Sequence, residues 1–568
     1  MDLSRRTRST RLMNPPVITL TLGGLVILLA VVTPSSGILH VLSTRPGDRL
    51  PELLLGIRLF KYSLAAFGCF LMVLSTLPIW KRSVPAYKAS SESRYHSLNS
   101  VMIGTILCIG AVLRLHALDS GLWHDEILTY VNYARLPFRE IVSTYRDQNQ
   151  HFLYTLLAHA SILIFGDSAW SLRLPAALFG TASIWALYLF AREVANEREA
   201  LVAAGLLTFS YHHVWFSQNA RGYIGLLFWT LLSSWFLVRA LRERQPRLWL
   251  FYAVAASLGV YTNTGMLFII AAHFIHYVWQ LMAGGKEKWA DRWSGLFLGF
   301  CTAGILTVML HALVLPQMLT SVEVSTVPAW KQPFWAVLEL LKAIEINFAG
   351  VIAAVGALLV FGIGLWSFAR TEPLVVELMI VPATTCAAVV IGIGFHVWPR
   401  LFFFTFGFAA LILIRGAMQL GQKGSQLFLK MSPTGALRTG TICAAGLILV
   451  SALSVPRAYA PKQDFLAALK FIDANKKPGD TIAMVGLVAF DYRNLYARDW
   501  QEVETLDELN SIRSHSKHTW LLYSFPTHVA AVYPEIMREI KKDFQIVKKF
   551  PGTIGDGSIF VSRSNQAL

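Results

Sequence analysis

The sequence predicts an α-helical, polytopic membrane protein with a small α/β domain at its carboxy-terminal end. Of its 568 residues, 55% are hydrophobic and only 15% are charged, whereas a soluble chain of this length needs far more charged surface. Apolar runs of about 18–20 residues, the length of a membrane span, recur along the chain between segments rich in Lys and Arg. The last hundred or so residues instead alternate short helix-like and strand-like segments, which is typical of an α/β domain.

The net charge of +16 could indicate a nucleic-acid partner, but its distribution argues against one. Most Lys and Arg residues lie in short loops between apolar runs, where they set the orientation of the spans. The first apolar run, at about 17–32, follows Arg5, Arg6, Arg8 and Arg11 and lacks a convincing small-residue cleavage site after it. We therefore expect it to be a retained first span and not a signal peptide.

Thirteen spans follow when the basic loops are placed in the cytoplasm. The inside loops and the amino-terminal tail then hold about twice as many Lys and Arg residues as the outside loops, as the positive-inside rule requires. This arrangement predicts a multi-pass plasma-membrane protein, in a bacterium the inner membrane, with a cytoplasmic amino terminus. The expected spans include those at about 17–34, 53–79, 99–117, 174–191, 199–216, 294–315, 350–369, 374–395 and 440–456.

Three parts are expected along the chain: a two-span extension with a basic loop (1–98), a membrane catalytic part (99–456) and an extracytoplasmic α/β domain (457–568). The long segment 119–173 is expected outside, and within it 152–165 could either lie at the interface or cross the membrane. In the last part we expect helices at 465–472 and 529–540, strands at 481–488 and 520–523, and a turn, not a phosphate loop, at 552–557.

The five cysteines lie inside apolar runs, and no pair of them has the spacing of a zinc site. They are expected to be small buried hydrophobic residues and not disulfides or metal ligands. The five are Cys69, Cys108, Cys301, Cys386 and Cys443.

Asp125 and Glu126 directly follow the apolar run 101–118, where the chain leaves the membrane. Two adjacent carboxylates near hydrocarbon are costly unless they are solvated, paired or used in function. A solvated loop or a helix cap would explain them equally well. Their functional interpretation depends on the polar residues that other loops bring to the same side.

In the predicted topology the conspicuous polar residues gather at span ends on one side of the membrane. A transporter more often places ionisable groups near the membrane centre, in broken helices. A reaction at the membrane surface is therefore the better interpretation. The residues are Asp125, Glu126, Asp147, Asn149, His151, Gln218, Asn219, Arg221, Tyr223, His396 and Arg400.

This placement suits a lipid-linked substrate with its tail among the spans and its phosphate at the interface. Arg221 and Arg400 are the candidate phosphate ligands, because a guanidinium forms paired hydrogen bonds with phosphate oxygens. Asp125 is the candidate general base. Structural alternatives exist for the others: the arginines could snorkel, His151 could form only local hydrogen bonds, and Tyr223 could belong to an aromatic belt.

Residues 99–240 resemble the family 39 glycosyltransferases, membrane enzymes of the GT-C type related to protein O-mannosyltransferases and aminoarabinose transferases. The resemblance depends on four motifs in order, at suitable spacing. They are Leu-Trp-His-Asp-Glu at 122–126, Asp-Gln-Asn-Gln-His-Phe-Leu-Tyr at 147–154, the Phe-Gly…Arg-Leu-Pro segment at 165–175, and Pro-Arg-Leu at 399–401.

The resemblance implies transfer of a sugar from a polyprenyl-phosphate sugar to a lipid, glycan or protein acceptor, with inversion at the anomeric carbon. It implies that Asp125 is the catalytic acidic residue of the first outer loop. Two departures from the family pattern matter: His151-Phe152 replaces a proline pair, and residues 219–223 lack the second acidic residue that some relatives carry. A divalent metal is therefore possible but not required.

The expected site has three groups of residues. Catalysis is assigned to Asp125 and Glu126, donor phosphate binding to His151, Arg221, Tyr223 and Arg400, and acceptor binding or support to His124, Asp147 and Asn219, with no metal ligand among them. Asp125 and Arg400 should lie close enough to share one sugar-phosphate. Two other functions stay open, a transporter or lipid flippase and an inactive relative that acts as a scaffold. The expected partners are the lipid-linked donor, its acceptor and membrane lipid, with no nucleic acid.

Overall fold

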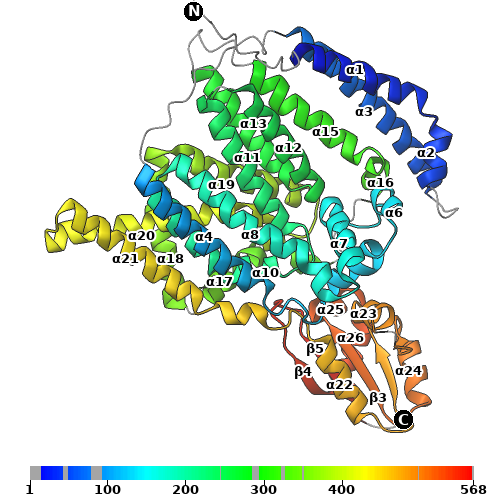
Figure 1. Cartoon of the computed structure of the whole chain (residues 1–568). Coiled ribbons are helices and arrows are strands. Elements are labelled where there is room, and N and C mark those ends of the chain that lie inside the picture. The colour runs from blue at the N-terminus through cyan, green and yellow to red at the C-terminus, as the bar shows by residue number, and fades with distance from the viewer. Residues whose placement is uncertain are drawn as a thin grey trace, which may run out of the picture.

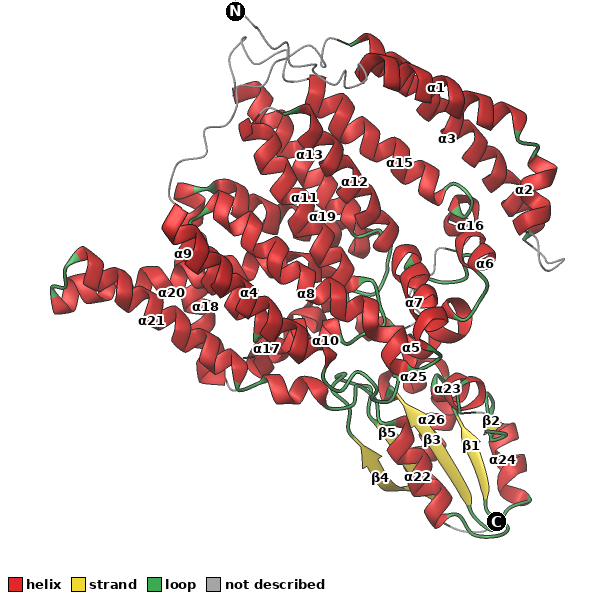
Figure 2. Ribbon diagram, viewed as in Figure 1, coloured by secondary structure: helices red, strands yellow, loops and turns green. Residues whose placement is uncertain are grey.

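The predicted fold class is confirmed by a computed structural model, in which helices form the membrane part and a five-stranded sheet lies at the carboxy-terminal end (Figures 1 and 2). Among the described residues, nine helices are long and apolar enough to cross a membrane, or ten if one bent pair counts as a span. Some of the basic residues used to predict which loops are cytoplasmic, such as Arg5, Lys81 and Lys286, lie outside the described residues. The structure describes residues 15–42, 49–77, 93–243, 245–283, 293–321, 327–347, 351–496 and 498–565.

Most helices of the membrane part lie together on one side of the sheet, and α1 and α3 lie side by side at the edge of this part, away from the sheet (Figure 1). The long elements are α3 (Leu50–Thr76), α4 (Ser93–Leu115), α8 (Ala169–Val194), α11 (Tyr223–Glu243), α13 (Met266–Ala283), α18 (Val351–Thr371), α19 (Pro373–Gly392), η6 with α20 (Pro399–Thr405 and Phe406–Leu429), and α21 with η7 (Pro433–Ala452 and Val455–Tyr459). The others are α1 (Pro15–Val32) and α2 (Ser35–Leu42), which form the bent pair, α5 (His124–Thr129), η2 (Tyr130–Ala134), α6 (Phe138–Ser143), α7 (Phe152–Phe165), α9 (Glu197–Thr208), α10 (Tyr211–Ser217), α12 (Pro246–Thr262), η4 (Gly295–Cys301), α15 (Thr302–His311), α16 (Leu315–Thr320), η5 (Pro328–Lys331) and α17 (Pro333–Asn347).

The span expected at 199–216 is two helices, α9 and α10, because the chain breaks at Phe209 and Ser210. A break in a membrane helix leaves carbonyl groups that need hydrogen-bond donors. The completely buried Arg114 of α4 supplies them, donating to the carbonyl oxygens of Leu207 at 3.1 Å and Thr208 at 3.4 Å. The sequence pattern did not reveal this break, because its stabilising donor lies on another helix.

Glycines allow α18 and α20 to approach to backbone contact. A Cβ atom on Gly364 would lie 1.9 Å from the carbonyl oxygen of Ile412, and one on Gly416 would lie 1.9 Å from that of Val360. Close helix packing through small residues is the usual means of association in membranes, where burial in lipid offers no hydrophobic gain. The α18–α20 crossing therefore depends on the absence of side chains at two positions.

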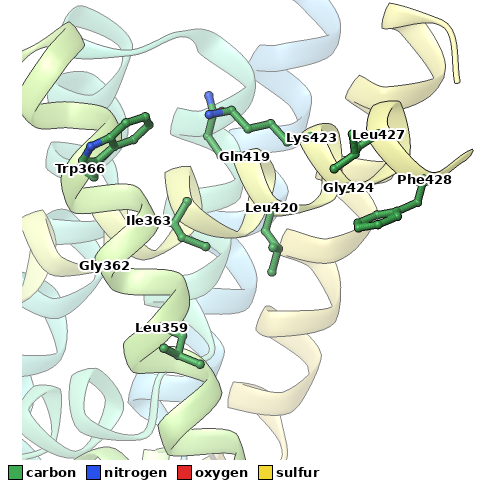
Figure 3. Close-up of a pocket in the computed structure, with 10 residues that line it drawn as sticks. All are labelled: Leu359, Gly362, Ile363, Trp366, Gln419, Leu420, Lys423, Gly424, Leu427 and Phe428. Atoms are coloured by element: carbon green, nitrogen blue, oxygen red, sulfur yellow. The ribbon is translucent and has the colours of Figure 1, made fainter. Parts of the chain in front are cut away.

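A groove beside this crossing lies between α18 and α20 (Figure 3). Its lining is largely apolar, as expected for helices that face lipid. At one end, the ammonium group of Lys423 lies 5.1 Å from the centroid of the Trp366 ring. Gly362 also lines the groove, and a Cβ atom there would meet nothing within 4 Å.

The carboxy-terminal domain is a mixed sheet in the order β2-β1-β3-β5-β4, with helices packed against it. β1 pairs in parallel with β2 and β3, whereas β5 pairs antiparallel with β3 and β4. The register aligns Ile482 with Trp520, whose side chain is buried. The elements are α22 (Phe465–Asn475), β1 (Thr481–Met484), α23 (Val488–Asn494), β2 (Gln501–Glu502), α24 (Leu506–Ser514), β3 (Thr519–Ser524), α25 (Pro526–Val532), α26 (Pro534–Asp543), β4 (Phe544–Phe550) and β5 (Ile559–Ser564).

Two sequence-based assignments in this domain were wrong in extent. The strand expected at 481–488 ends at Met484, because Gly486 has a φ of +74° and turns the chain into α23. The helix expected at 529–540 is divided into α25 and α26 at Pro534, which lacks the N–H that a continuous helix requires. The expected helix at 465–472, the strand at 520–523 and the turn at 552–557 are confirmed.

The carboxy-terminal domain contacts the membrane part at α5 and α10 (Figure 2). The indole N–H of Trp215 donates to the hydroxyl of Thr553 at 2.8 Å, and the ammonium group of Lys462 donates to the carbonyl oxygen of Gln218 at 2.7 Å. Lys462 is buried, and burial lowers its pKa to about 7. The domain is therefore joined by polar contacts to the loops that carry the predicted site.

The Gly364→Ala substitution should destabilise the protein by about 1–3 kcal/mol, the usual cost of overpacking, because the new methyl group would collide with the backbone of α20. The measurement is the thermal unfolding midpoint of the purified protein in detergent. Gly362→Ala, on the same helix, is the matched control and should leave the midpoint nearly unchanged. Equal midpoints for both variants would contradict the proposed backbone contact.

Candidate active site

The two adjacent carboxylates lie in the first turn of the short helix α5, where the helix dipole favours negative charge. Consecutive side chains on a helix point about 100° apart. Asp125 and Glu126 therefore face different surroundings, although both are buried. The hydroxyl of Thr129 closes the turn by donating to the carbonyl oxygen of Asp125 at 2.9 Å.

Asp125 lies between two arginines from distant parts of the chain. Its Oδ2 atom is 2.5 Å from Nη1 of Arg221, in the loop before α11, and 2.9 Å from Nη1 of Arg400, in η6. Burial raises the pKa of the Asp125 carboxyl group, but the two guanidinium groups outweigh burial and hold it below its usual range. The carboxylate is therefore ionised at neutral pH, and the expected proximity of Asp125 to Arg400 is observed.

Three buried nitrogens near Asp125 have no hydrogen-bond partner among the described residues. They are Nε and Nη1 of Arg221 and Nε2 of His151, although Nη1 of Arg221 forms the ion pair with Asp125. The imidazole ring of His151 lies edge-on to Tyr223, with the ring centroids 5.5 Å apart. Burial and the charge of Arg221 lower the pKa of His151 well below its usual value, so the ring is neutral. Two guanidinium groups against one carboxylate leave this centre with one excess positive charge and unused hydrogen-bonding capacity.

Glu126 has a different environment, because its carboxylate is completely occupied. Oε1 accepts from Nε of Arg173 at 2.8 Å and from the backbone N–H of Ala220 at 2.8 Å. Oε2 accepts from a second Arg173 nitrogen and from the backbone N–H of Trp123 at 3.3 Å. Burial raises the pKa of Glu126, but Arg173 outweighs it and lowers the pKa below the usual range. This geometry holds α5 in place and leaves no carboxylate oxygen free for a substrate.

Arg173 also holds the segment that leads into α5. It donates to the carbonyl oxygens of Leu118 at 2.8 Å, Ser120 at 2.7 Å and Gly121 at 2.9 Å. The Arg173 side chain is 1% exposed, so these carbonyl groups and Glu126 replace water around its guanidinium group. One arginine of α8 thus organises the chain from the end of α4 to the start of α5.

His124 contacts the carboxy-terminal domain. Its Nδ1 atom lies 3.0 Å from both carboxylate oxygens of Asp491, in α23, and its backbone N–H donates to Oε1 of Gln463 at 3.1 Å. Burial alone would lower the pKa of His124, but Asp491 outweighs burial and raises it. Burial outweighs the effect of His124 on Asp491 and raises the pKa of that carboxyl group. The imidazole and the carboxylate therefore form a buried hydrogen-bonded pair next to Asp125.

The remaining predicted residues are placed differently. Asn219 accepts a hydrogen bond from the indole N–H of Trp123 at 3.2 Å, and Tyr223 lies under the guanidinium of Arg221, 5.5 Å from carbon to ring centroid. Asp147 accepts from the backbone N–H of Asn149 at 2.8 Å, within its own loop. No described contact joins Asp147 to Asp125. Asp147 is therefore not brought into this site.

Sequence reasoning gave no role to three residues that the structure places at the site: Arg173, Gln463 and Asp491. Arg173 lies in the quoted segment 165–175, and its position inside an apolar run was a usable signal. Gln463 and Asp491 belong to the carboxy-terminal domain and have no local pattern that distinguishes them. Their proximity to His124 arises only from the docking of that domain.

The residues around Asp125 do not fit a divalent metal. Among the described residues no group of three or more His, Cys, Asp or Glu side chains could hold a metal ion. Divalent cations such as Mg²⁺ require several oxygen ligands, whereas Asp125 is already neutralised by two guanidinium groups. The chemistry of this centre is that of an anion site.

The Arg173→Met substitution should destabilise the protein by about 3–5 kcal/mol, because it leaves the charge of Glu126 buried without a partner. Thermal unfolding of the purified protein measures the effect. Arg192→Met, at the other end of α8, removes a half-exposed partner of Glu197 and should change stability by about 0.5 kcal/mol or less. A similar loss in both variants would mean that the Arg173–Glu126 pair is not the structural anchor inferred above.

Comparison with known proteins supports a relationship with membrane glycosyltransferases. Residues 150–313 match the model of the dolichyl-phosphate-mannose-protein mannosyltransferase family. A Bacillus subtilis protein named as a candidate mannosyltransferase, YkcB, is 28% identical over 191 residues, 33% of this chain and 24% of the relative. An undecaprenyl phosphate-α-4-amino-4-deoxy-L-arabinose arabinosyl transferase of Pseudomonas fluorescens is 27% identical over 180 residues, 30% of this chain and 29% of the relative. The matches therefore span less than a third of each curated relative.

Two similar solved structures are the archaeal oligosaccharyltransferase AglB from Archaeoglobus fulgidus, in complex with an inhibitory peptide and a dolichol-phosphate, and ArnT from Cupriavidus metallidurans, bound to undecaprenyl phosphate. The first has a TM-score of 0.49 and 12% identity, covering 82% of this chain and 74% of that chain. The second has a TM-score of 0.44 and 12% identity, covering 82% and 98%. The expected resemblance to membrane glycosyltransferases is confirmed by these matches. The family match includes the end of the second motif and the whole of the third, at 165–175.

Proposed function

We propose that the protein transfers a sugar from a polyprenyl-phosphate-linked donor to an acceptor, at the membrane face that carries Asp125. The observation that carries this proposal is the convergence of one carboxylate and two guanidinium groups, from three separate segments, at a single buried point. The similarity to a family of dolichyl-phosphate-mannose-protein mannosyltransferases supports the same class of donor. In this proposal the acceptor is a lipid, a glycan or a protein.

The charge at this centre matches the charge of such a donor. A sugar linked through one phosphate to a lipid is a phosphodiester with one negative charge, which would balance the excess positive charge of Asp125, Arg221 and Arg400. The unpartnered nitrogens of Arg221 and His151 supply further donors to phosphate oxygens. When the donor bond breaks, the leaving phosphate gains a second negative charge, and the same groups stabilise it.

Asp125 would act as the general base. The acceptor oxygen or nitrogen attacks the anomeric carbon and forms the new glycosidic bond, while the bond from that carbon to the phosphate oxygen breaks and its electrons leave with the phosphate. The proton of the acceptor moves to the Asp125 carboxylate. A carboxylate paired with two guanidinium groups is a weak base, but a bound phosphate competes for those groups and so raises the basicity of Asp125.

The other predicted residues take supporting roles in this proposal. Glu126 positions α5 through Arg173 and does not react, because its oxygens are occupied. Tyr223 supports the guanidinium of Arg221.

The distribution of Lys and Arg along the chain supports an extracytoplasmic site in the plasma membrane. In this proposal the chain has the three parts expected above, with boundaries after residues 98 and 456.

Transport is the second candidate function, because an ionisable pair joins two of the helices long enough to span the membrane. His276 of α13 lies 2.7 Å from Glu377 of α19, and such pairs often mark ion or substrate pathways. Uptake or flipping of a lipid-linked sugar by vesicles that contain the protein but no acceptor would favour transport. Dependence of sugar transfer on Asp125 would favour the glycosyltransferase.

Asp125→Asn should reduce sugar transfer about 10²–10⁴-fold, the usual contribution of a positioned base. The measurement is release of undecaprenyl phosphate from an undecaprenyl-phosphate sugar by purified protein in the presence of a membrane extract as the acceptor source. Asp119→Asn, an exposed carboxylate in the same loop, should retain activity. Full activity of a correctly folded Asp125→Asn protein would exclude the role proposed for this residue.

Arg400→Ala should raise the KM for the lipid donor more than it lowers kcat, because it removes a phosphate ligand. It should also move the acid limb of the pH–activity profile to higher pH. The Arg400 guanidinium helps to lower the pKa of Asp125, so its removal lets the carboxyl group bind a proton at a higher pH. Arg438→Ala, an exposed residue of α21, serves as the control. An unchanged KM and an unchanged acid limb would contradict the proposed phosphate site.

A further inference from the structure

We propose that the carboxy-terminal α/β domain is part of the catalytic unit, and that Asp491 is the positioning residue through which it acts. In this proposal Asp491 holds His124, and with it α5, so that Asp125 faces the two arginines. The inference rests on the proposed function for its catalytic consequence. Its structural part, the ordering of α5 by the domain, can be tested independently.

The first observation is the contact between Asp491 and His124. Both carboxylate oxygens lie 3.0 Å from Nδ1 of His124, across 367 residues of sequence, and the Asp491 side chain is 1% exposed. Phe490, next to it on α23, packs edge-to-face on the same imidazole with ring centroids 6.4 Å apart. A carboxylate this deeply buried is costly without a charged partner, and His124 is the partner that the described residues provide.

The second observation is that the same domain caps α5. The N–H groups in the first turn of a helix have no partner within the helix. The backbone N–H of His124 donates to Oε1 of Gln463 at 3.1 Å, and the side chain of Gln463 in turn donates to the carbonyl oxygen of Gly557 at 3.1 Å. Both the side chain and the backbone of His124 are thus held by the carboxy-terminal domain.

The third observation is the position of Asp125 between two anchors. α5 has only six residues, too few for a helix to be stable by itself. The residue before Asp125 is held by Asp491 from the domain, and the residue after it is held by Arg173 from α8. Asp125 alone is left to face Arg221 and Arg400. The two anchors therefore determine the direction of the reacting carboxylate.

The test compares Asp491→Asn with Asp473→Asn in the full chain. Asp473 is a half-exposed carboxylate of the same domain, paired with Arg498, and has no described contact with α5. Amide hydrogen exchange, followed by mass spectrometry of peptides that cover residues 123–130, reports the order of α5 without any substrate. Asp491→Asn should accelerate exchange in these peptides at least threefold, with little change in the peptides of α8, whereas Asp473→Asn should leave both as in the wild type. Unchanged exchange in Asp491→Asn would overturn the proposal.

Kinetics distinguish positioning from general stability. Asp491→Asn should lower kcat about tenfold and leave the KM for an undecaprenyl-phosphate sugar within twofold, because the phosphate ligands stay in place. His124→Gln should give the same loss, and the double variant should be no worse than either single variant. Asp491→Glu, which keeps the charge, should recover part of the activity. Additive losses in the double variant, or an equal loss with Asp473→Asn, would count against the proposal.

Two further outcomes are decisive. If Asp491→Asn does not yield folded protein, His124→Gln examines the same contact from the membrane side, and its exchange result decides the question. If α5 is loosened as expected but the wild-type protein neither binds undecaprenyl phosphate nor transfers sugar, the structural link is supported and the proposed function fails.

Discussion

The buried ion pair between Arg173 and Glu126 is the interaction on which the candidate site depends. It joins α8 to α5, and the same guanidinium group holds three carbonyl groups of the connecting segment. A buried pair of this kind gains little free energy over well-packed apolar residues, because both charges lose their hydration. Its value is geometric, since an unpaired charge at this depth is so unfavourable that alternative arrangements of α5 are disfavoured. The orientation of Asp125 follows from that restriction.

Adjacent residues of α5 are thereby given three distinct environments. His124 faces a carboxylate of the carboxy-terminal domain, Glu126 faces an arginine of the membrane part, and Asp125 faces two arginines that have further hydrogen-bonding capacity. The first two pairs are electrically balanced, whereas the third has an excess positive charge. An anionic substrate would therefore be attracted to Asp125 and not to its neighbours, which gives a physical reason why one of two adjacent acids is suited to chemistry.

The helices of the membrane part are held in place by local interactions that differ from those in the core of a soluble protein. Backbone contact at Gly364 and Gly416 replaces side-chain packing between α18 and α20. Arg114 satisfies the carbonyl groups exposed where α9 ends, so that α10 can begin a new direction beside the site. The second interaction meets the constraint that, in lipid, every polar backbone group needs a partner from the protein.

The sequence by itself determined the membrane class, the α/β character of the last part, and the candidacy of Asp125, Arg221 and Arg400. These follow from local rules: an apolar run of sufficient length must span, and a charge at its end must be paired or used. Only the tertiary structure decided the partners. Asp125 and Arg400 are 275 residues apart, and His124 and Asp491 are 367 apart. The tertiary structure gave Glu126 and Asp125 different partners, left Asp147 within its own loop, and placed Arg173 and Asp491 next to α5. The sequence could not predict these contacts, because contacts between distant segments depend on how helices and domains pack and produce no periodic pattern along the chain.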